Sequence, residues 1–382
     1  MLKKIILDNY KTYINPTEID FSAKGYEFLE EENVGSNKIL KGALFVGENA
    51  SGKTQILRAM RLLLNLLFGT DRINFFYNKS FYSEKDEYSI TYVFAVEDSE
   101  IRYKIGFGNN GILMERLTLD GKSAMYRFGK KARFMDNDLA YNDALSDKLL
   151  LLRRVYYDTH FNGNPILKRW FAFLQNSVYV NCYEGIVESE NKNVFPENYL
   201  NEKDAEGINK FLKEIGYRQK IKYDTEVKDA AGHKIWRNDN AKFVSFVKEG
   251  TGVYIPEFLE STGNKTLMYI LPTFLHAVNV DCMVILDEFS SGLHNEMEEC
   301  LIKFFHRRSQ NSQLFFTSHS TNILNNAILR PDQIYAVSFK GKEGSVLKRF
   351  SDESPREAQN IEKMYLNGIF EGMPKYGRNL EI

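Results

Sequence analysis

Cysteine is scarce in this sequence, which contains only three in 382 residues: Cys182, Cys282 and Cys300. Cysteines so few and so widely spaced exclude a disulfide framework and a cysteine-rich metal site. They are typical of reduced thiols in the cytoplasm. We therefore expect a cytoplasmic protein.

An excess of charge of one sign is also lacking, because 50 Lys and Arg residues balance 51 Asp and Glu residues. This balance excludes a global basic excess, which would indicate a nucleic-acid-binding protein, but it leaves room for a local basic patch. No apolar run is long enough to cross a bilayer, and Asp8 interrupts the apolar start of the chain too early for a signal peptide. We expect no contact with a membrane.

Core-forming residues, by contrast, are plentiful. Hydrophobic residues make up 43% of the chain and aromatic residues 14%, which excludes wholesale disorder. The length allows one large domain or two ordinary ones. Neither an internal repeat nor a low-complexity linker divides the sequence.

A complete phosphate-loop motif, G-x-x-x-x-G-K-[ST], occupies residues 47–54. The apolar run 43–46 precedes it and an amphipathic run follows, which is the order strand, loop, helix. Backbone N–H groups of such a loop and the helix N-terminus bind phosphate, while the lysine reaches the β- and γ-phosphates. The motif supplies the candidate nucleotide-binding residues Gly47, Asn49, Ala50, Ser51, Gly52, Lys53 and Thr54.

A second apolar run, residues 283–286, ends in the acidic pair Asp287 and Glu288. Such a short run predicts a buried parallel strand, whose carboxyl end lies where α/β folds bind ligands. Asp287 with the Thr54 hydroxyl is then the candidate Mg²⁺ site, and Glu288 the candidate base that activates water. Two exposed acids at a strand end are the alternative, which the phosphate loop in the same chain disfavours.

Two weaker candidates flank this strand. Ser261 and Gly263, with Lys265 just beyond, begin a helix-like run, and a small Ser-x-Gly loop at a helix start is an anion site. His319 follows the next predicted strand, residues 313–317. A lone histidine is more often structural, but one at this place is a candidate sensor of the γ-phosphate.

The long separation of Lys53 from Asp287 predicts a large insertion between their two strands. Residues 88–119 alternate as an antiparallel meander of three strands, and residues 135–217 are mainly helical in pattern. We predict an α/β fold with three parts. They are a first lobe with phosphate loop and meander (1–124), a mainly helical insertion (125–245), and a second lobe with the acidic strand and His319 (246–382).

Two further stretches have open interpretations. Asn9 and Lys11 fit either a solvated hairpin edge or a nucleotide contact, and both remain candidate nucleotide-binding residues. Residues 122–134 interleave Lys and Arg with Tyr and Phe, a pattern that suits either nucleic acid or a solvated hairpin face. Composition favours the hairpin face.

The order of the motifs along this chain resembles that of the ABC-type ATPase heads of the SMC, RecF and OLD group. The motifs are the phosphate loop, the Ser-x-Gly turn, the Asp287-Glu288 strand and the turns at residues 293–294 and 318–319. Residues 330–334, 344–347 and 365–374 look like the C-terminal pattern of RloA/AbiL-type (AriA-like) ATPases, which occur in anti-phage abortive-infection systems. The resemblance covers roughly residues 1–107 and 245–374.

The resemblance implies an ATPase whose active site is complete only when two copies of the chain form a dimer. Ser261, Gly263 and Lys265 of one copy would close over ATP and Mg²⁺ on Lys53 of another in a head-to-tail dimer, with Glu288 as base and His319 as sensor. The sequence departs from the family pattern at two points. No Q-loop glutamine is recognisable in residues 75–86, and Asn295 follows Leu-His where proline is usual.

Two functions follow as hypotheses. In the first, the protein is a switch ATPase of an anti-phage system that holds a toxin or nuclease effector, supplied as a separate chain, until a phage-encoded trigger arrives. In the second, it is a RecF-like DNA-repair clamp, for which residues 122–134 give weak support. An ABC transporter subunit is disfavoured, because the sequence has Ser-Thr-Gly-Asn-Lys at 261–265 in place of the transporter signature.

Overall fold

The phosphate-loop strand lies inside a seven-stranded sheet of order β11-β10-β17-β18-β3-β19-β20. A computed structural model describes residues 1–70, 72–135, 137–139, 146–229, 231–238 and 241–373. The five central strands run parallel and the two edge strands, β11 and β20, run antiparallel. The strands are β11 (Ile186–Glu188), β10 (Val178–Asn181), β17 (Met283–Asp287), β18 (Gln313–Thr317), β3 (Gly42–Gly47), β19 (Ile334–Phe339) and β20 (Ser345–Arg349).

An eight-stranded antiparallel sheet forms a second layer, of order β2-β1-β4-β5-β6-β7-β8-β9. It contains the predicted meander, β4–β6, in which each strand pairs with the next. The strands are β1 (Leu2–Asp8), β2 (Thr17–Asp20), β4 (Tyr88–Val96), β5 (Ser99–Phe107), β6 (Ile112–Leu119), β7 (Lys122–Phe128), β8 (Lys131–Phe134) and β9 (Asn137–Leu139).

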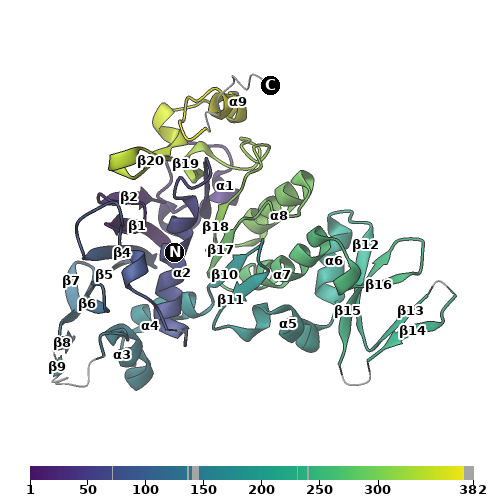
Figure 1. Cartoon of the computed structure of the whole chain (residues 1–382), viewed down its shortest axis with the longest axis horizontal. Coiled ribbons are helices and arrows are strands. Elements are labelled where there is room, and N and C mark those ends of the chain that lie inside the picture. Colours follow the sequence, from purple (N-terminus) through teal and green to yellow (C-terminus); the bar gives the residue numbers. More distant parts are fainter. Residues whose placement is uncertain (71, 136, 140–145, 230, 239–240, 374–382) are drawn as a thin grey trace.

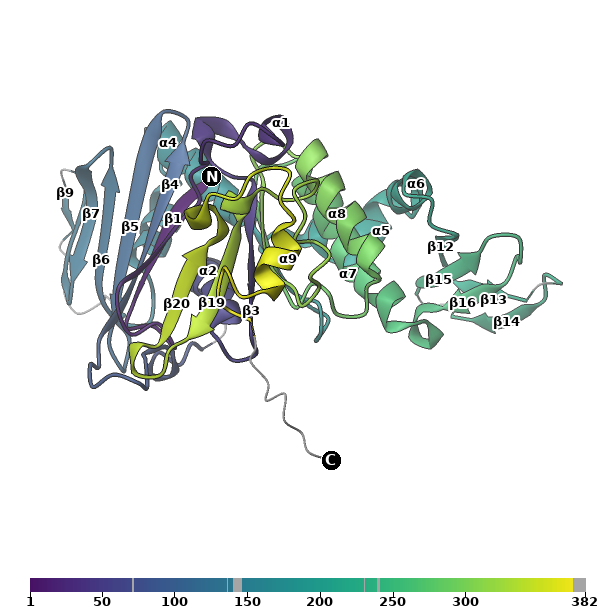
Figure 2. The same ribbon diagram turned by 90° about the horizontal axis from the view of Figure 1, so that it is seen from above.

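The parallel strands are buried on both faces, as their continuous apolar runs predict. One face packs with α2 and the antiparallel sheet around one hydrophobic core, and the other packs with α7 and α8 around a second core. Figure 2 shows these layers side by side. The helices are α1 (Glu30–Asn33), α2 (Lys53–Phe68), α3 (Leu151–Thr159), α4 (Pro165–Gln175), α5 (Pro196–Lys203), α6 (Glu206–Glu214), α7 (Thr262–Ala277), α8 (Asn295–Arg308) and α9 (Ile361–Leu366).

The middle of the chain differs from the predicted helical insertion. It contains helices α3–α6, but β10 lies within the parallel sheet, beside β17. The run 178–181 is too short for its periodicity to distinguish a strand from a helix, so only its pairing with β17 reveals it. Beyond α6, strands project from the body as an arm (Figure 1). They are β12 (Gln219–Asp224), β13 (Glu226–Lys228), β14 (Lys234–Arg237), β15 (Phe243–Lys248) and β16 (Tyr254–Pro256).

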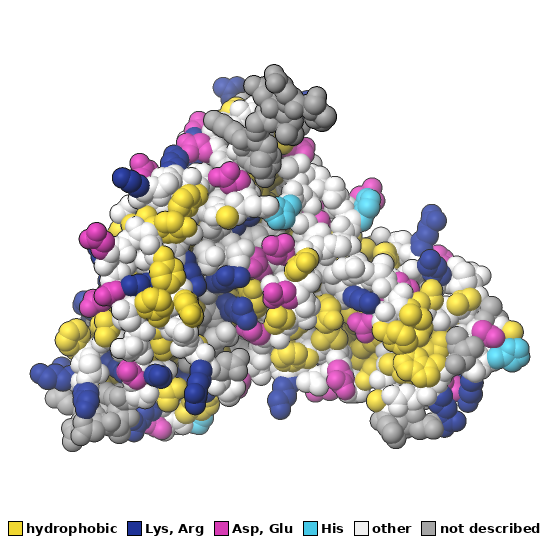
Figure 3. Space-filling view, in the orientation of Figure 1, with side chains coloured by type: hydrophobic (Ala, Val, Ile, Leu, Met, Phe, Trp, Pro, Cys, Tyr) yellow, Lys and Arg dark blue, Asp and Glu magenta, His cyan; other side chains and the backbone are white. Residues whose placement is uncertain are grey.

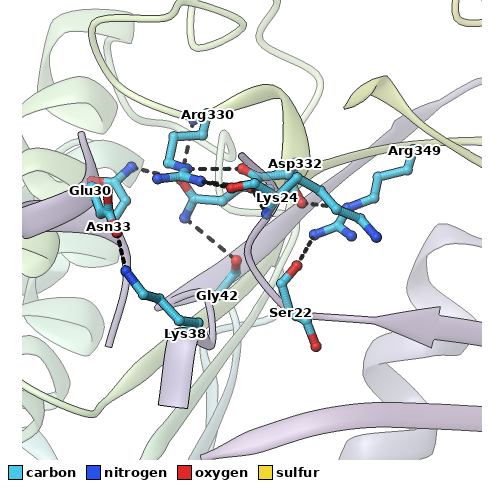
Figure 4. A network of polar contacts seen from close by, with 10 residues as sticks. Ser22, Lys24, Glu30, Asn33, Lys38, Gly42, Arg330, Asp332 and Arg349 are labelled. Atoms are coloured by element: carbon cyan, nitrogen blue, oxygen red, sulfur yellow. Dashed lines mark hydrogen bonds and ion pairs between the residues drawn. The ribbon is translucent and has the colours of Figure 1, made fainter. Parts of the chain in front are cut away.

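A buried polar network fastens the segment after β2 to the start and end of the β19–β20 hairpin (Figure 4). The side chains of Arg330 and Asp332 are fully buried and form an ion pair of 2.9 Å. Arg330 also donates to the Lys24 carbonyl oxygen, and the Lys24 N–H donates to Asp332. Arg349 donates to the carbonyl oxygen of Ser22 at 2.7 Å. Residues 330–334, part of the C-terminal pattern, therefore hold the fold together, and Pro374 of that pattern lies outside the described residues.

None of the helices among the described residues combines the length and the apolar character that crossing a bilayer requires.

Candidate nucleotide-binding site

The phosphate loop leaves the carboxyl end of β3 and turns directly into α2. Gly47 and Gly52 both have positive φ, 148° and 111°. A Cβ at Gly47 would lie 2.2 Å from the Val337 carbonyl oxygen, and one at Gly52 would lie 2.4 Å from the Ser345 hydroxyl oxygen. These two positions therefore accept only glycine, both for backbone conformation and for space.

Lys53 folds back over this loop. Its Nζ donates to the carbonyl oxygens of Gly47 at 2.8 Å and of Glu48 at 2.7 Å. The residue is only 7% exposed. Burial lowers the pKa of Lys53, while the carboxylates of Glu288, Asp287 and Glu48 raise it. The ammonium group thus lies at the loop centre, within reach of the acidic strand end.

Asp287 joins the phosphate loop to two neighbouring strands. Its Oδ1 accepts hydrogen bonds from the hydroxyls of Thr54 at 3.0 Å and Thr317 at 2.8 Å. Strand β18 lies between β3 and β17, so all three strand ends meet at one edge of the sheet. Carboxylate and hydroxyl oxygens are the ligands that Mg²⁺ prefers, and Thr54 and Asp287 therefore fit the predicted ion.

Glu288 occupies an unusual backbone conformation. It has a φ of 60°, in the left-handed region that non-glycine residues rarely adopt. Its N–H donates to the Thr317 hydroxyl at 2.9 Å, the same hydroxyl that donates to Asp287. Strain of this kind persists where surrounding contacts enforce it and is common at functional sites. The hydroxyl of Thr317 therefore positions both acidic residues.

The Ser261 loop is attached to the turn that follows Glu288. Ser261 is exposed and caps α7, its hydroxyl accepting from the Asn264 N–H at 3.3 Å. A Cβ at Gly263 would lie 2.4 Å from the Gly292 carbonyl oxygen, and Thr266 donates to the carbonyl of Ser291 at 3.2 Å. A movement of the turn would therefore move the start of α7.

Lys265, the remaining signature candidate, lies in the first turn of α7. Its Nζ donates to the Phe258 carbonyl oxygen at 3.2 Å. Among the described hydrogen bonds, those of Ser261 and Lys265 stay close to the start of α7 and include none to the phosphate loop of the same chain.

His319 lies exposed beyond the end of β18, on a loop that is held from both sides. Its N–H donates to the Ser290 hydroxyl at 3.2 Å. The flanking Ser318 and Ser320 hydroxyls donate to the two carboxylate oxygens of Glu298 on α8, at 3.2 and 2.8 Å. Glu298 is fully buried, and burial raises its pKa. The buried carboxylate thus braces the histidine loop against α8.

Comparison with known proteins agrees with this geometry. A family model described as "AAA domain, putative AbiEii toxin, Type IV TA system" matches residues 43–325, which include the phosphate loop, the acidic pair and His319. The chain belongs to this family. It is a family of ATPase domains, whereas the RloA/AbiL subtype stays a prediction. None of the curated proteins matches the sequence significantly.

Solved structures share the fold at low sequence identity. An SMC head bound to the C-winged helix domain of ScpA is 14% identical, with 92% of this chain and 99% of that chain covered and a TM-score of 0.50. The SMC head domain from Thermotoga maritima is 16% identical, covering 91% and 98%, with a TM-score of 0.49. The recombination mediator protein RecF is 13% identical, covering 84% and 92%, with a TM-score of 0.39. The match to the SMC head bound to ScpA confirms the predicted α/β fold.

Asn9 and Lys11 have structural contacts in this family member. Asn9 is buried, and its Nδ2 donates to the carbonyl oxygens of Lys85 at 3.0 Å and Glu87 at 2.8 Å. Lys11 Nζ donates to the Tyr77 carbonyl oxygen at 2.6 Å. Both side chains thus hold the loop between α2 and β4, and their contact with a nucleotide stays a prediction.

Four residues that no sequence motif predicts support the site. Tyr13 donates to the Gly52 carbonyl oxygen at 3.1 Å, and Ser345 donates to the Ser51 carbonyl oxygen at 2.6 Å. The other two are Thr12, which closes the space beside Gly52, and Thr317. No motif marks these positions. Apart from Thr317, which ends a predicted strand beside His319, the sequence offers no signal that could have found them.

The basic and aromatic stretch 122–134 forms β7 and β8. Tyr126 and Phe128 are exposed, 41% and 62%. Arg127, which alternates with them, points inward and forms a buried ion pair of 3.1 Å with Glu115. Its charge is therefore not available to nucleic acid, while Lys130 and Lys131 are exposed.

Proposed function

We propose that this protein binds and hydrolyses ATP with Mg²⁺ and uses the cycle as a conformational switch. The observation that carries the proposal is the meeting of the Thr54 and Thr317 hydroxyls on Asp287, beside the loop that holds Lys53. Lys53 binds the phosphates, Thr54 and Asp287 hold Mg²⁺, and the ion neutralises phosphate charge when bound. Glu288 accepts the proton of the attacking water, and His319 contacts the γ-phosphate.

Hydrolysis takes place between two copies of the chain. The exposed Ser261 and the N-terminus of the 16-residue helix α7 offer hydrogen-bond donors and a positive dipole end to an anion. In a head-to-tail dimer they close over the γ-phosphate that Lys53 of the other copy holds. The contact of Gly263 with Gly292 then links closure to the turn after Glu288.

The switch serves an anti-phage system. The matched family is named for a putative toxin of a type IV toxin–antitoxin system, and residues 330–334, 344–347 and 365–374 resemble abortive-infection ATPases. In this proposal the chain is the sensor and scaffold. It holds a toxin or nuclease effector, a separate protein, and releases it when a phage-encoded trigger changes the nucleotide state.

Two substitutions test the nucleotide chemistry. Lys53→Ala removes the ammonium group from the loop centre, so ATP binding measured by calorimetry should be lost. Glu288→Gln should retain ATP binding but release phosphate at least about 100-fold more slowly, since it removes the general base. Glu296→Gln, an exposed acid on α8, is the matched control and should behave as wild type. Unchanged turnover in Glu288→Gln would move the base elsewhere.

Native mass spectrometry tests the assembly. Tagged Glu288→Gln protein, expressed with its chromosomal neighbours and purified in ATP, should carry a second, effector-like chain. Purification with Lys53→Ala in its place is the control, because it lacks the nucleotide-bound state. A homo-oligomer that carries only nucleotide would contradict the effector role while leaving the ATPase intact.

A RecF-like DNA clamp is the second candidate, favoured only by the exposed Lys130 and Lys131 beside Tyr126 and Phe128. Duplex DNA binding should then weaken steeply with salt, and Lys130→Glu with Lys131→Glu should flatten that dependence. Binding that is absent or independent of salt would exclude the clamp.

A further inference from the structure

The loop between α2 and β4 carries several exposed aromatic residues. Phe76, Tyr77, Phe81 and Tyr82, which we name the loop patch, are 40%, 59%, 61% and 58% exposed. The ring of Phe76 lies 5.4 Å from that of Phe81 and 5.7 Å from that of Tyr77. Four large exposed aromatics in one short loop exceed what a solvated surface requires.

The loop patch is fixed next to the phosphate loop. The Ser80 N–H donates to the Asn9 carbonyl oxygen and the Lys11 N–H to that of Asn78, both at 2.9 Å. The same strand-end turn continues to Tyr13, whose hydroxyl donates to the Gly52 carbonyl oxygen. The patch therefore has a defined place beside one half of the nucleotide site.

A second apolar cluster lies on the arm. Trp236, Phe243, Phe258 and Leu259 form this arm patch, in which the Trp236 ring stacks on Phe243 at 4.8 Å and meets Phe258 edge-on at 5.0 Å. Phe258 and Leu259 are 58% and 68% exposed. They lie three and two residues before Ser261, respectively, and the Lys265 ammonium donates to the Phe258 carbonyl oxygen. The arm patch therefore adjoins the other half of the site.

Figure 3 shows hydrophobic side chains on one face of the molecule, over the arm strands and, apart from them, beside α2 and β4, with both acidic and basic side chains between. A two-fold axis that brings the phosphate loop of one copy to Ser261 of the other also brings their surroundings together. The loop patch, beside the phosphate loop of one copy, then faces the arm patch, beside Ser261 of the other copy. The two-fold symmetry forms this contact twice.

We infer that the loop patch of one copy packs on the arm patch of a second copy when ATP closes the pair. This inference rests on the head-to-tail dimer proposed above and adds the surface that holds it. Aromatic side chains are enriched in the buried centres of protein interfaces because they bury much apolar area at low entropic cost. The arm thereby senses the nucleotide state of the other copy.

Site-directed cross-linking tests the contact. Both partners carry Glu288→Gln and Cys300→Ser, which leaves only the buried Cys182 and Cys282 as natural thiols. One partner adds Phe81→Cys and the other, with a different tag, adds Leu259→Cys. A short bis-maleimide should join the two chains only in the mixture and only with ATP. Phe128→Cys, as exposed as Phe81 but on β7, replaces Phe81→Cys as the control and should give no product.

Dimer affinity gives an independent measure. Phe81→Ser and Leu259→Ser should each weaken the ATP-bound dimer of the Glu288→Gln protein about 30-fold in sedimentation, as expected for interface hot spots. Their combination should weaken it by less than the product of the two, because the side chains contact each other. Phe128→Ser should leave the affinity unchanged.

The outcomes separate this inference from the proposed function. An ATP-dependent dimer that forms without the cross-link and tolerates both substitutions would refute the patch contact and leave the proposed ATPase dimer standing. A cross-link that forms equally without ATP would also refute it. If the Glu288→Gln protein binds ATP but stays monomeric, both the head-to-tail dimer and the patch contact are wrong.

Discussion

The hydroxyl of Thr317 is the contact whose removal tests the site most directly. Thr317→Val keeps the shape of the side chain but removes the donor to Asp287, at 2.8 Å, and the acceptor for the Glu288 N–H, at 2.9 Å. The residue is 4% exposed, so water cannot replace the hydroxyl freely. The left-handed backbone of Glu288 loses one of the contacts that enforce it.

The magnitude follows from those two bonds. A hydrogen bond to a charged group contributes roughly 1.5–3 kcal/mol, and a buried N–H left without a partner costs about 1–3 kcal/mol. Because Thr54 still donates to Asp287, we expect the lower part of the sum, a loss of about 2.5–4 kcal/mol in the free energy of unfolding. Turnover should fall about 10- to 100-fold, because Glu288 is no longer held in position.

Urea unfolding and steady-state phosphate release measure the two effects. Thr317→Ser restores the hydroxyl and should recover most of the turnover. Thr273→Val is the matched control, since this buried threonine on α7 donates only to the Tyr269 carbonyl of its own helix, at 3.4 Å. Wild-type turnover in Thr317→Val would refute the positioning role, even if stability fell.

Three further predictions concern buried polar groups. Arg330→Met leaves the buried Asp332 carboxylate without its ion-pair partner. It should lower the free energy of unfolding, measured in urea, by about 3–5 kcal/mol. A loss below about 1 kcal/mol would contradict a stabilising role of the buried ion pair. Burial lowers the pKa of His306 from 6.5 to about 3. Below pH 6.5 the unfolded chain therefore binds a proton at this residue that the folded chain does not, and the free energy of unfolding decreases as the pH is lowered. His306→Asn should remove about 1.5 kcal/mol of that fall between pH 6.5 and pH 5, and an unchanged pH profile would refute it. Glu298→Ala frees the histidine loop and should slow turnover about 10-fold with unchanged ATP affinity, with Glu298→Gln partly restoring the rate.

Short sequence motifs were enough to predict the main residues of the site. The loop 47–54 must have glycines at its two ends, and a single strand must deliver Asp287 and Glu288, so local spacing carries both signals. The helix after Thr54 also followed from its apolar spacing and ends at Phe68. The order of the strands in the sheet could not be predicted from these segments, because strand pairing depends on contacts between residues far apart in the chain.

The interpretation of the middle segment and of Asn9 shows the same limit. The run 178–181 is a strand because β17 offers it a parallel partner, which nothing within those four residues records. Asn9 resembled a ligand residue because it is polar at a strand end, yet its amide is bound by the carbonyls of Lys85 and Glu87. A polar side chain has the same local pattern whether its partner is a ligand or a distant backbone.

By itself, the sequence determined that this chain has a phosphate loop and an acidic strand end, because each depends on neighbouring residues. The order of its motifs along the chain indicated the fold of an ATPase head by resemblance to a family. The tertiary structure alone decided that Thr317 joins Asp287 to Glu288, that Tyr13 and Ser345 support the phosphate loop, and that the aromatic residues of the loop before β4 and of the arm are exposed. Those contacts connect residues from separate strands and loops. Their specificity arises from packing and hydrogen-bond geometry, which exist only once the sheet has assembled.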